Sequence, residues 1–350
     1  MVVSLKKKRF TMNIKYLLPL FAAAMMAACS DDDSSPSQVQ DPVSVDSSSS
    51  ADMLPLPELS SSDAASSTVS SSGTAPVDGL SSSAPATSSA ATGEVLDENG
   101  KLLVLDPSYE YIFYGGELTG KEQFKYGRFE ARMKMAAIPG TVSSMFLNYD
   151  NSYKLGEEPW NEIDIEILGK DQTKWQSNII TREADPAIKG TTTSETIHEY
   201  GFDATQEFHL YAIVWTPEYV AWEIDSVEVR RDTLGMTHGT HADADQVKFL
   251  TENQSLRFNL WASKTPSWTG KFTGIGLPIE QQIDYVRTYS YDEATKGFTL
   301  LWQDDFEGTS LNSERWSRGN WTMELVEYRI ENVKVSDGMA RIILDYEKTR

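Results

Sequence analysis

Apolar and polar residues alternate in short runs along residues 101–350. Side chains of a β-strand point to the two faces of a sheet in turn, so a period of two predicts strands. Turn residues such as Pro139-Gly140 and Asp337-Gly338 separate the runs, and no run has the period of a long helix. Many short strands of this kind are typical of an all-β sandwich or jelly roll. The pattern predicts strands at residues 127–135, 143–148, 161–168, 177–182, 208–215, 219–224, 227–231, 256–261, 283–291, 298–306, 332–335 and 340–344.

The strand predicted at 161–168 differs from the others because its polar positions are all acidic. Its isoleucines share one face, and Glu162, Asp164 and Glu166 share the other. Burying an unpaired carboxylate is costly, and three like charges on one face repel. A fold selected for stability alone would avoid this row, whereas a cleft that needs carboxylates with different pKa values would use it. A surface strand with solvated acids is the alternative interpretation.

The hydrolysis of glycosidic bonds uses paired carboxylates most directly. One carboxyl group protonates the leaving oxygen, and the other attacks the anomeric carbon or activates water. A retaining enzyme needs the pair about 5–5.5 Å apart, but Cα atoms four residues apart on a strand are separated by ~13 Å. The side chains of Glu162 and Glu166 would therefore have to lean together on a curved, concave sheet.

Residues 1–29 have the pattern of a secretory signal peptide. A basic head containing Lys6–Arg9 is followed by the apolar run Tyr16–Ala28, which is too short to span a bilayer. The segment Met26–Cys29 resembles a bacterial lipobox, which implies a lipidated Cys29 and a protein anchored to the outer membrane of a Gram-negative bacterium, at the cell surface. Cys29 is the only cysteine, so we expect the mature domain to fold without disulfides.

Residues 30–98 are rich in Ser, Ala, Pro, Thr and Asp and contain neither Lys nor Arg. This composition predicts a disordered tether, which leaves residues 99–350 as the catalytic β-sandwich domain. Residues 101–350 hold 26 of the 31 basic residues and 40 of the 52 acidic ones, a net charge of −14. That charge argues against nucleic acid or an anionic lipid surface as a partner and is compatible with a neutral polymer.

Five segments occur in a fixed order in this part of the chain: Gly115-Gly116-Glu117, Tyr126–Lys134, Trp160–Gly169, Phe208–Trp215 and Asp284–Tyr289. This series resembles glycoside hydrolase family 16. Within the family, Arg257–Trp261 and Gln176–Thr181 look most like the bacterial mixed-linkage β-glucanases, or lichenases. The resemblance implies a concanavalin-like jelly-roll β-sandwich of two curved antiparallel sheets.

The order of the segments differs from most of that family. The strands predicted at 298–306, 332–335 and 340–344, together with Trp316, follow Asp284–Tyr289 here, whereas their counterparts precede the catalytic segment in most members. The resemblance therefore implies a circularly permuted chain, as in a few lichenases. Asn99–Leu105 also resembles Asp337–Leu344, which suggests that the two are remnants of one duplicated strand.

The resemblance assigns roles to individual residues. Glu162 would be the nucleophile, Glu166 the general acid and base, and Asp164 the carboxylate between them. Lichenases often carry Tyr at the position of Asn148 and Asn at that of Asp150. We assign Trp215, Trp222, Trp302 and Trp316 to packing. The residues expected to bind substrate are Glu117, Phe146, Trp160, Gln176, Asn178, Arg257, Asn259, Trp261, Trp268 and Trp321.

The expected activity is that of a retaining endo-β-glucanase acting on mixed-linkage 1,3-1,4-β-D-glucan. Laminarinases usually insert one residue between the Asp and the second Glu, and Asp164-Ile165-Glu166 has no insertion. The alternatives are a xyloglucan-active or 1,3-β-glucan-active enzyme of the family, or a surface lipoprotein that binds glycan without cutting it. No cofactor is expected for catalysis, and we expect a monomer. A structural calcium ion would be held by Asp284 and the carbonyl groups of Asp305 and Gly338.

Overall fold

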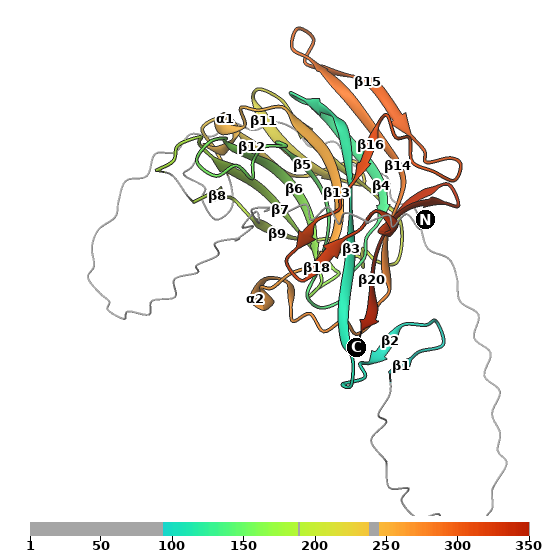
Figure 1. Ribbon diagram of the computed structural model, residues 1–350. Helices are drawn as coiled ribbons and strands as arrows, with labels where there is room; N and C mark the ends of the chain where they lie inside the picture. Colours follow the sequence, from blue (N-terminus) through green and yellow to red (C-terminus); the bar gives the residue numbers. More distant parts are fainter. Residues whose placement is uncertain (1–93, 188–189, 238–244, 350) are drawn as a thin grey trace, which may run out of the picture. The chain divides into compact units, whose positions relative to one another are not determined.

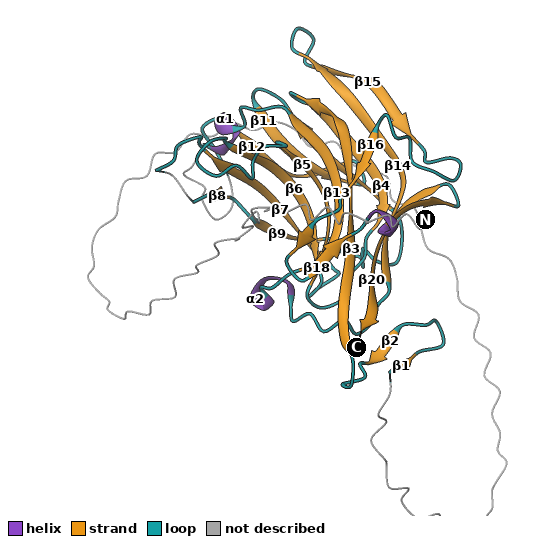
Figure 2. Ribbon diagram, viewed as in Figure 1, coloured by secondary structure: helices purple, strands orange, loops and turns teal. Residues whose placement is uncertain are grey.

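The computed structural model describes residues 94–187, 190–237 and 245–349. The predicted signal peptide, Cys29 and the predicted tether up to residue 93 lie outside these residues. In the described part, strands dominate, and the helices are limited to α1 (Gln246–Phe249), α2 (Pro266–Thr269) and the 3-10 turn η1 (Ile330–Asn332) (Figure 2). None of these helices is long and apolar enough to cross a membrane.

One sheet, here called the acid sheet, contains the acidic strand between β5 and β7 (Figure 1). Its strands are all antiparallel to their neighbours. In spatial order they are β8 (Thr192–Thr193) and β9 (Thr196–Glu199), β7 (Lys174–Arg182), β6 (Trp160–Leu168), β5 (Thr141–Asn148), β13 (Gln254–Ala262), β3 (Glu110–Phe124) and β16 (Trp316–Arg318).

A second antiparallel sheet, the opposite sheet, packs against the first. Its long strand β14 has two partners on one side, β20 along its first half and β15 along its second half. In spatial order the sheet contains β12 (Val227–Thr233), β11 (Tyr219–Ile224), β10 (His209–Trp215), β4 (Gly127–Lys134), β14 (Ile279–Asp292), then β15 (Gly297–Asp304), β20 (Met339–Thr349) and β19 (Val333–Ser336).

Strand β20 joins the two sheets, because its last residues leave β14 and pair with the start of β3. Two short strands, β17 (Thr322–Met323) and β18 (Val326–Tyr328), extend this junction, and β18 runs parallel to β3. Figure 1 shows strands of both sheets that curve along their length. The predicted all-β sandwich of curved antiparallel sheets is confirmed.

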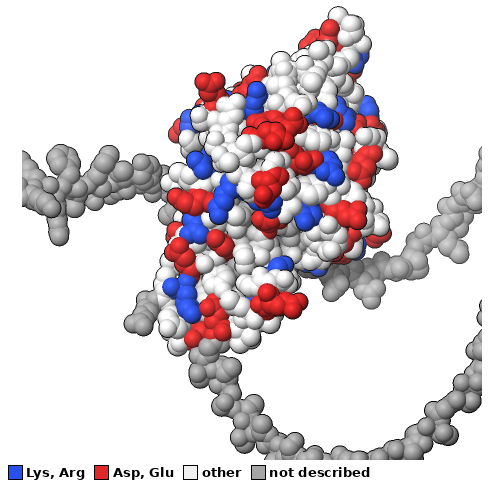
Figure 3. Space-filling view, turned by 90° about the vertical axis from the view of Figure 1, so that its right-hand side faces the viewer, with Lys and Arg blue, Asp and Glu red and all other residues white. Residues whose placement is uncertain are grey.

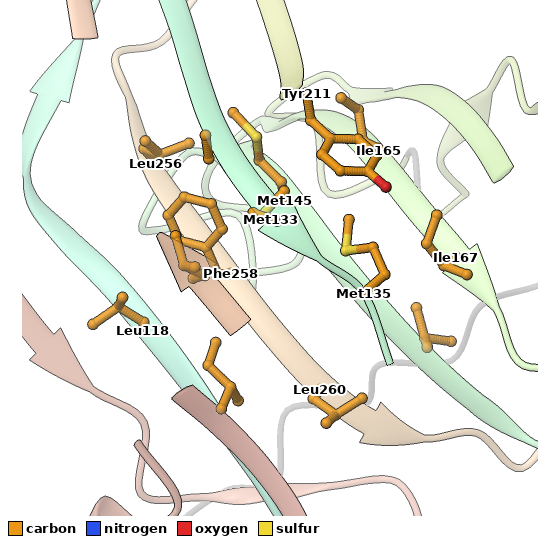
Figure 4. Close-up of a cluster of buried hydrophobic side chains, with 14 of the residues drawn as sticks. Leu118, Met133, Met135, Met145, Ile165, Ile167, Tyr211, Leu256, Phe258 and Leu260 are labelled. Atoms are coloured by element: carbon orange, nitrogen blue, oxygen red, sulfur yellow. The ribbon is translucent and has the colours of Figure 1, made fainter. Parts of the chain in front are cut away.

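The core lies between the two sheets and is built by the inward face of each strand. Met133 of β4, Met145 of β5 and Ile165 of β6 come from different parts of the chain and meet in one buried cluster (Figure 4). All three side chains are fully shielded from solvent. Each such side chain contributes roughly 1.5–3 kcal/mol to the free energy of unfolding through apolar burial, so the core fixes which face of β6 points outward.

Strand β3 was missed by the sequence pattern, although it is the longest strand among the described residues. Its Gly115, Gly116 and Gly120 weaken the alternation, and they are needed for close packing. A Cβ atom on Gly115 would lie 2.4 Å from the backbone oxygen of Leu260, so only glycine fits there.

The boundary predicted between tether and domain lies a few residues too late. Val95 and Leu96 form β1, which pairs with β2 (Leu102–Val104), and the carboxylate of Glu94 lies 3.1 Å from the ammonium group of Lys348. These contacts place residues 94–98 with the sandwich rather than with the tether.

The C-terminal strands complete both sheets. In particular, β20 lies beside β14 and β3, and β16 extends the edge of β3. The two similar segments, Asn99–Leu105 and Asp337–Leu344, each include the second strand of a hairpin. β20 pairs with Ile279–Ile283, and the amide of Leu102 donates to the carbonyl of Leu277 at 2.7 Å, just before that stretch. A common origin of the two segments stays a prediction.

The charged side chains are mixed in sign on the side that lies to the right in Figure 1. Figure 3 shows acidic and basic side chains interspersed on that side. The net charge of −21 carried by the chain therefore does not form a single acidic patch there.

Candidate active site

The core determines where the acids of β6 point. Ile163, Ile165 and Ile167 are all fully buried between the sheets. Because neighbouring residues of a strand face opposite ways, the acidic side chains project from the outer face of the acid sheet, here called the acid face. The alternation predicted from the sequence is confirmed.

The pairing of β6 with both neighbours is regular, without a bulge. Each acid is therefore flanked on the acid face by one residue of β5 and one of β7. Glu166 lies between Ser144 and Gln176, Asp164 between Phe146 and Asn178, and Glu162 between Asn148 and Ile180.

Glu162 receives two N–H donors on the same oxygen. The indole Nε1 of Trp160 donates to its Oε2 at 3.0 Å, and the amide Nδ2 of Asn148 also donates to Oε2. Burial raises the pKa of Glu162 above its ordinary value, and these donors, with Asp164 and Arg257, act in the opposite direction. The ionised form of Glu162 is thus stabilised within a buried setting.

Glu166 sits in a different environment. The amide Nε2 of Gln176 donates to its Oε2 at 2.7 Å, and the indole Nε1 of Trp268 donates to Oε1 of Gln176 at 3.1 Å. Burial, followed by the charge of Glu162, raises the pKa of Glu166 to about 8. Glu166 therefore holds a proton at neutral pH, as a general acid must.

Asp164 lies between the two glutamates on the same face of β6. Burial first, then the charges of Glu162 and Glu166, raise its pKa well above the ordinary value. Its backbone carbonyl accepts a hydrogen bond of 2.9 Å from the indole of Trp222, which reaches across the core from β11. The protonated form of Asp164 is therefore favoured, and the three acids titrate as one coupled set.

Several of the predicted polar binding residues share the acid face with these carboxylates. Asn259 of β13 pairs with Glu117 of β3 and with Ser144 of β5. The guanidinium of Arg257 lies 3.3 Å from the carboxylate of Glu117, and burial is the main cause that raises the pKa of that carboxyl group. The predicted set thus extends across β3, β13, β5, β6 and β7.

The predicted aromatic residues differ in exposure. Trp321 is 41% exposed, so its ring is accessible at the end of the acid face formed by the C-terminal strands. Trp268 is half-buried. Trp261 and Phe146 are only 7% and 8% exposed. Trp261 shares the acid face with Arg257 and Asn259, because alternate residues of β13 point to the same side. Its ring lies 5.9 Å from that of Trp268 and is packed with the buried apolar residues, and its role in substrate binding stays a prediction.

The four tryptophans assigned to packing behave as predicted. Trp215, Trp222 and Trp316 are almost completely buried. Trp302 is half-buried on β15, where the guanidinium of Arg315 stacks on its ring at 3.9 Å and its indole donates to Glu122 at 2.8 Å.

The predicted binding residues did not include Asn148 and Asp150, which were noted only as differences from lichenases. Asn148 bonds to Glu162, and the carboxylate of Asp150 lies 2.7 Å from the guanidinium of Arg257. The signal was present, because Phe146 was already placed on this face and Asn148 follows it by two residues on the same strand.

A cavity of about 390 Å³ lies beyond Glu166, past the end of β6. Ile197, one of its lining residues, pairs with Gln176, so the cavity borders the hydrogen-bonded pair of Gln176 and Glu166. None of the three acids lines it, so this cavity is separate from the acid face. Its lining residues are Leu168, Lys170, Asp171, Lys174, Trp175 and Ile197.

The predicted calcium ligands lie on the opposite sheet. Two residues beyond Asp284, Val286 pairs with Asp304 at the end of β15, which precedes Asp305. One residue before Asp284, Ile283 pairs with Ala340 near the start of β20, which follows Gly338. The carboxylate of Asp284 is engaged by Arg132, with Nη1 at 2.7 Å from Oδ2. Within the described residues, no group of three or more His, Cys, Asp or Glu side chains is arranged to hold a metal ion. The calcium site, which needs two backbone carbonyls, stays a prediction.

Comparison with known proteins places this arrangement in a family. The description "Glycosyl hydrolases family 16" matches residues 83–287, which is more than half of the chain. The chain is 42% identical over 238 residues to a β-glucanase of Fibrobacter succinogenes, covering 66% of this chain and 64% of that protein. It is 36% identical over 202 residues to a β-glucanase of Acetivibrio thermocellus, covering 56% and 53%. The matched part is thus less than two thirds of either relative.

Solved structures were matched as well. The β-glucanase of Bacillus licheniformis has a TM-score of 0.40 at 25% identity, covering 57% of this chain and 82% of that one. A prokaryotic β-1,3-1,4-glucanase (lichenase) derived from a mouse hindgut metagenome has a TM-score of 0.39 at 26% identity, covering 55% and 88%. From the sequence match, the chain belongs to glycosyl hydrolase family 16.

Proposed function

We propose that the protein is a retaining endo-β-glucanase that hydrolyses mixed-linkage 1,3-1,4-β-D-glucan, as found in lichenan and barley. The single observation that carries this proposal is the contrast between two glutamates on one strand face. Burial raises the pKa of both, to about 8 for Glu166, but the N–H donors of Trp160 and Asn148 oppose the rise at Glu162. The identity to the Fibrobacter β-glucanase supports a β-glucan as the substrate.

Each glutamate has one role in each of two steps. Glu162 attacks the anomeric carbon as a carboxylate, while Glu166 gives its proton to the departing glycosidic oxygen. Glu166, now ionised, then takes a proton from the water that hydrolyses the glycosyl-enzyme and releases Glu162. Each step inverts the anomeric centre, so the product retains the β-configuration.

The regular pairing of β6 supports the mixed-linkage glucan over a purely 1,3-linked one. Laminarinases usually carry an extra residue that bulges this strand, and β6 pairs with β5 and β7 without a shift. A xyloglucan-active enzyme is the second candidate, because such members also lack the extra residue.

The panel that tests the proposal contains barley β-glucan, lichenan, laminarin, carboxymethylcellulose and xyloglucan. We expect the full chain to release reducing sugar from the first two and little from the others. Preference for laminarin or xyloglucan would reassign the substrate within the family. Binding to these polymers without any release of sugar would indicate a surface glycan-binding lipoprotein instead.

We also propose a lipid anchor at Cys29, attachment to the outer membrane, a monomeric state and a circularly permuted order of strands. The lipobox-like segment before Cys29 supports the anchor. For the permutation, the support is that the family match ends at residue 287, while later strands complete both sheets. Labelled palmitate should be incorporated into the wild type and lost in Cys29→Ser, and equal membrane partitioning of the two would contradict the anchor.

A further inference from the structure

We infer that Asn148 is a positioning residue that holds the nucleophile Glu162 by one oxygen and leaves the other free to attack. This inference rests on the proposed glycosidase function and extends it to a residue outside the predicted catalytic and binding sets. Asn148 pairs directly with Glu162 across β5 and β6, and its amide bonds to Oε2 of that carboxylate.

The orientation of the amide follows from the chemistry of the pair. An ionised carboxylate only accepts hydrogen bonds, so the NH2 group of Asn148 is the part that faces Glu162. Asn148 is 8% exposed, and its backbone carbonyl accepts from the hydroxyl of Ser255 at 3.3 Å, which holds the residue from the β13 side. A short, buried side chain held in this way loses little freedom when it bonds to the nucleophile.

Both nitrogen donors converge on one oxygen of the carboxylate. Nδ2 of Asn148 and Nε1 of Trp160 bond to Oε2 of Glu162. Oε1 is therefore the oxygen that forms the bond to the anomeric carbon, as the glycosidic bond to the leaving oxygen breaks and Glu166 protonates that oxygen. Oε2 becomes the carbonyl oxygen of the resulting ester.

The surroundings of Glu162 explain why its ionised form needs such donors. Glu162 shares its strand face with Asp164 and Glu166. The charge of Arg257 on β13 also acts on it, and its neighbour on β7 is the uncharged Ile180. Burial disfavours the ionised form of Glu162, and the hydrogen bond with Asp164 and the charge of Arg257 oppose this effect only in part. Because Arg257 is already bonded to Glu117 and Asp150, neutral donors supply the direct hydrogen bonds to the nucleophile.

Asn148→Ala removes the amide donor, and Asn148→Asp keeps the shape but adds a like charge. Asn151→Ala is the matched control, because Asn151 lies three residues on and donates to the Tyr149 hydroxyl at 3.1 Å instead of to an acid. We expect Asn148→Ala to lower kcat/KM by roughly 10- to 100-fold, because this range corresponds to the free energy that a hydrogen bond to a charged group contributes. Asn148→Asp should lose more, and the control little.

The choice of substrate isolates the nucleophile. An aryl β-glycoside with a good leaving group needs no proton from Glu166, so the loss in Asn148→Ala should persist on that substrate. Removing a donor to the ionised form raises a pKa, so the acidic limb of the kcat/KM profile should move to higher pH in both Asn148 variants. If the good leaving group restores full activity, Asn148 acts through Glu166, and the inference is wrong.

A titration that needs no substrate separates this inference from the proposed function. The pKa of Glu162 can be followed by NMR with 13C-labelled glutamate, and its signal is assigned by its loss in Glu162→Gln. We expect the pKa of Glu162 to rise by about 1 in Asn148→Ala, the equivalent of a tenfold effect, and to rise further in Asn148→Asp.

An unchanged pKa in both variants would overturn the role of Asn148, even if the wild type proves active on β-glucan. A raised pKa with a wild type inactive on every polymer would leave the inference standing and remove the proposed function.

Discussion

The outer faces of the two sheets both carry buried carboxylates, but their partners differ. On the opposite sheet, Glu130 is 5% exposed and bonds to three groups. Its oxygens lie 3.2 Å from Arg128 and 3.5 Å from Arg287, and the hydroxyl of Tyr289 donates to it at 3.0 Å. Arg128 continues the row to Glu223 at 2.8 Å. This carboxylate is compensated by cations on both sides.

On the acid face, the carboxylates are not compensated in this way. Among the described residues, neither Glu162, Asp164 nor Glu166 forms an ion pair with a lysine or arginine, and the donors that Glu162 and Glu166 receive are amides and an indole. The pKa values of Glu162, Asp164 and Glu166 are therefore raised, whereas the carboxylates of the opposite sheet form a row of ion pairs. The comparison teaches that the choice of partner, rather than the acid itself, separates a structural carboxylate from a reactive one.

The largest effects should follow from removing the two catalytic glutamates. Glu162→Ala should be inactive on polymer, because no group remains to form the glycosyl-enzyme. Glu166→Ala should lose roughly 10²–10⁴-fold on polymer but much less on aryl glycosides whose leaving group needs no proton. Glu130→Gln is the matched control on the opposite sheet and should retain kcat once folded.

Azide distinguishes the two roles. In Glu162→Ala it should attack the substrate directly and give an α-glycosyl azide. In Glu166→Ala it should attack the glycosyl-enzyme and give a β-glycosyl azide. Formation of the α-azide by Glu166→Ala and of the β-azide by Glu162→Ala would mean that the two glutamates have been assigned in reverse.

Stability should respond in opposite directions to the same substitution on the two faces. Glu130→Gln removes the charge between Arg128 and Arg287 and should lower the free energy of unfolding by about 1.5–3 kcal/mol. Glu166→Gln removes an uncompensated carboxyl group and should raise it. Chemical denaturation of both variants at pH 8.5 provides the measurement, and a loss of stability in Glu166→Gln would contradict the comparison.

The pH dependence sharpens this test. The pKa of Glu166 is about 8 in the folded protein, against an ordinary value of 4.5. Between these values the folded state keeps a proton that the unfolded chain has released, so the free energy of unfolding falls as pH rises through the window. The advantage of Glu166→Gln over the wild type should therefore be small below pH 4.5 and grow towards pH 8. An advantage that does not depend on pH would point to packing instead.

The acid face illustrates how far sequence reasoning reaches. The alternation in Asn161–Leu168 was sufficient to place three acids on one face and three isoleucines in the core, because the period of a strand leaves no other arrangement. The relation between Glu166 and Gln176 depends on pairing between separate strands. The resemblance to a family predicted that Gln176 belongs to the site, and the local pattern of residues alone could not predict it.

Other features could not be predicted for physical reasons. Strand β3 was hidden because its glycines are placed by the close approach of Leu260, a contact made across the sheet. The contact of the Trp261 ring with that of Trp268, at 5.9 Å between centroids, depends on the position of α2, and the ion pair of Asp284 with Arg132 depends on the pairing of β14 with β4. The first and the last of these contacts join residues more than a hundred positions apart.

The aromatic residues of the acid face should show intermediate effects. Trp268→Ala should weaken binding of a glucan oligosaccharide by about 1–3 kcal/mol, by analogy with other losses of aromatic contacts, and should change thermal stability little. Trp261→Ala should weaken binding and also lower stability, because Trp261 is 7% exposed within the apolar cluster. Calorimetric titration and thermal unfolding separate the two contributions. Loss of stability with unchanged affinity in Trp268→Ala would assign that residue to the core.

The smallest effect is expected at Asp284, on the opposite sheet. Its ion pair with Arg132 joins side chains that are 38% and 42% exposed, and exposed pairs contribute only about 0–1 kcal/mol. In the presence of a chelator, Asp284→Asn should therefore unfold within a few degrees of the wild type.

Calcium changes the expectation, because an ion that binds only the folded state raises the melting temperature with its concentration. If Asp284 with the carbonyls of Asp305 and Gly338 holds calcium, added calcium should stabilise the wild type and leave Asp284→Asn unaffected. The same response in both proteins would show that this carboxylate serves only its ion pair.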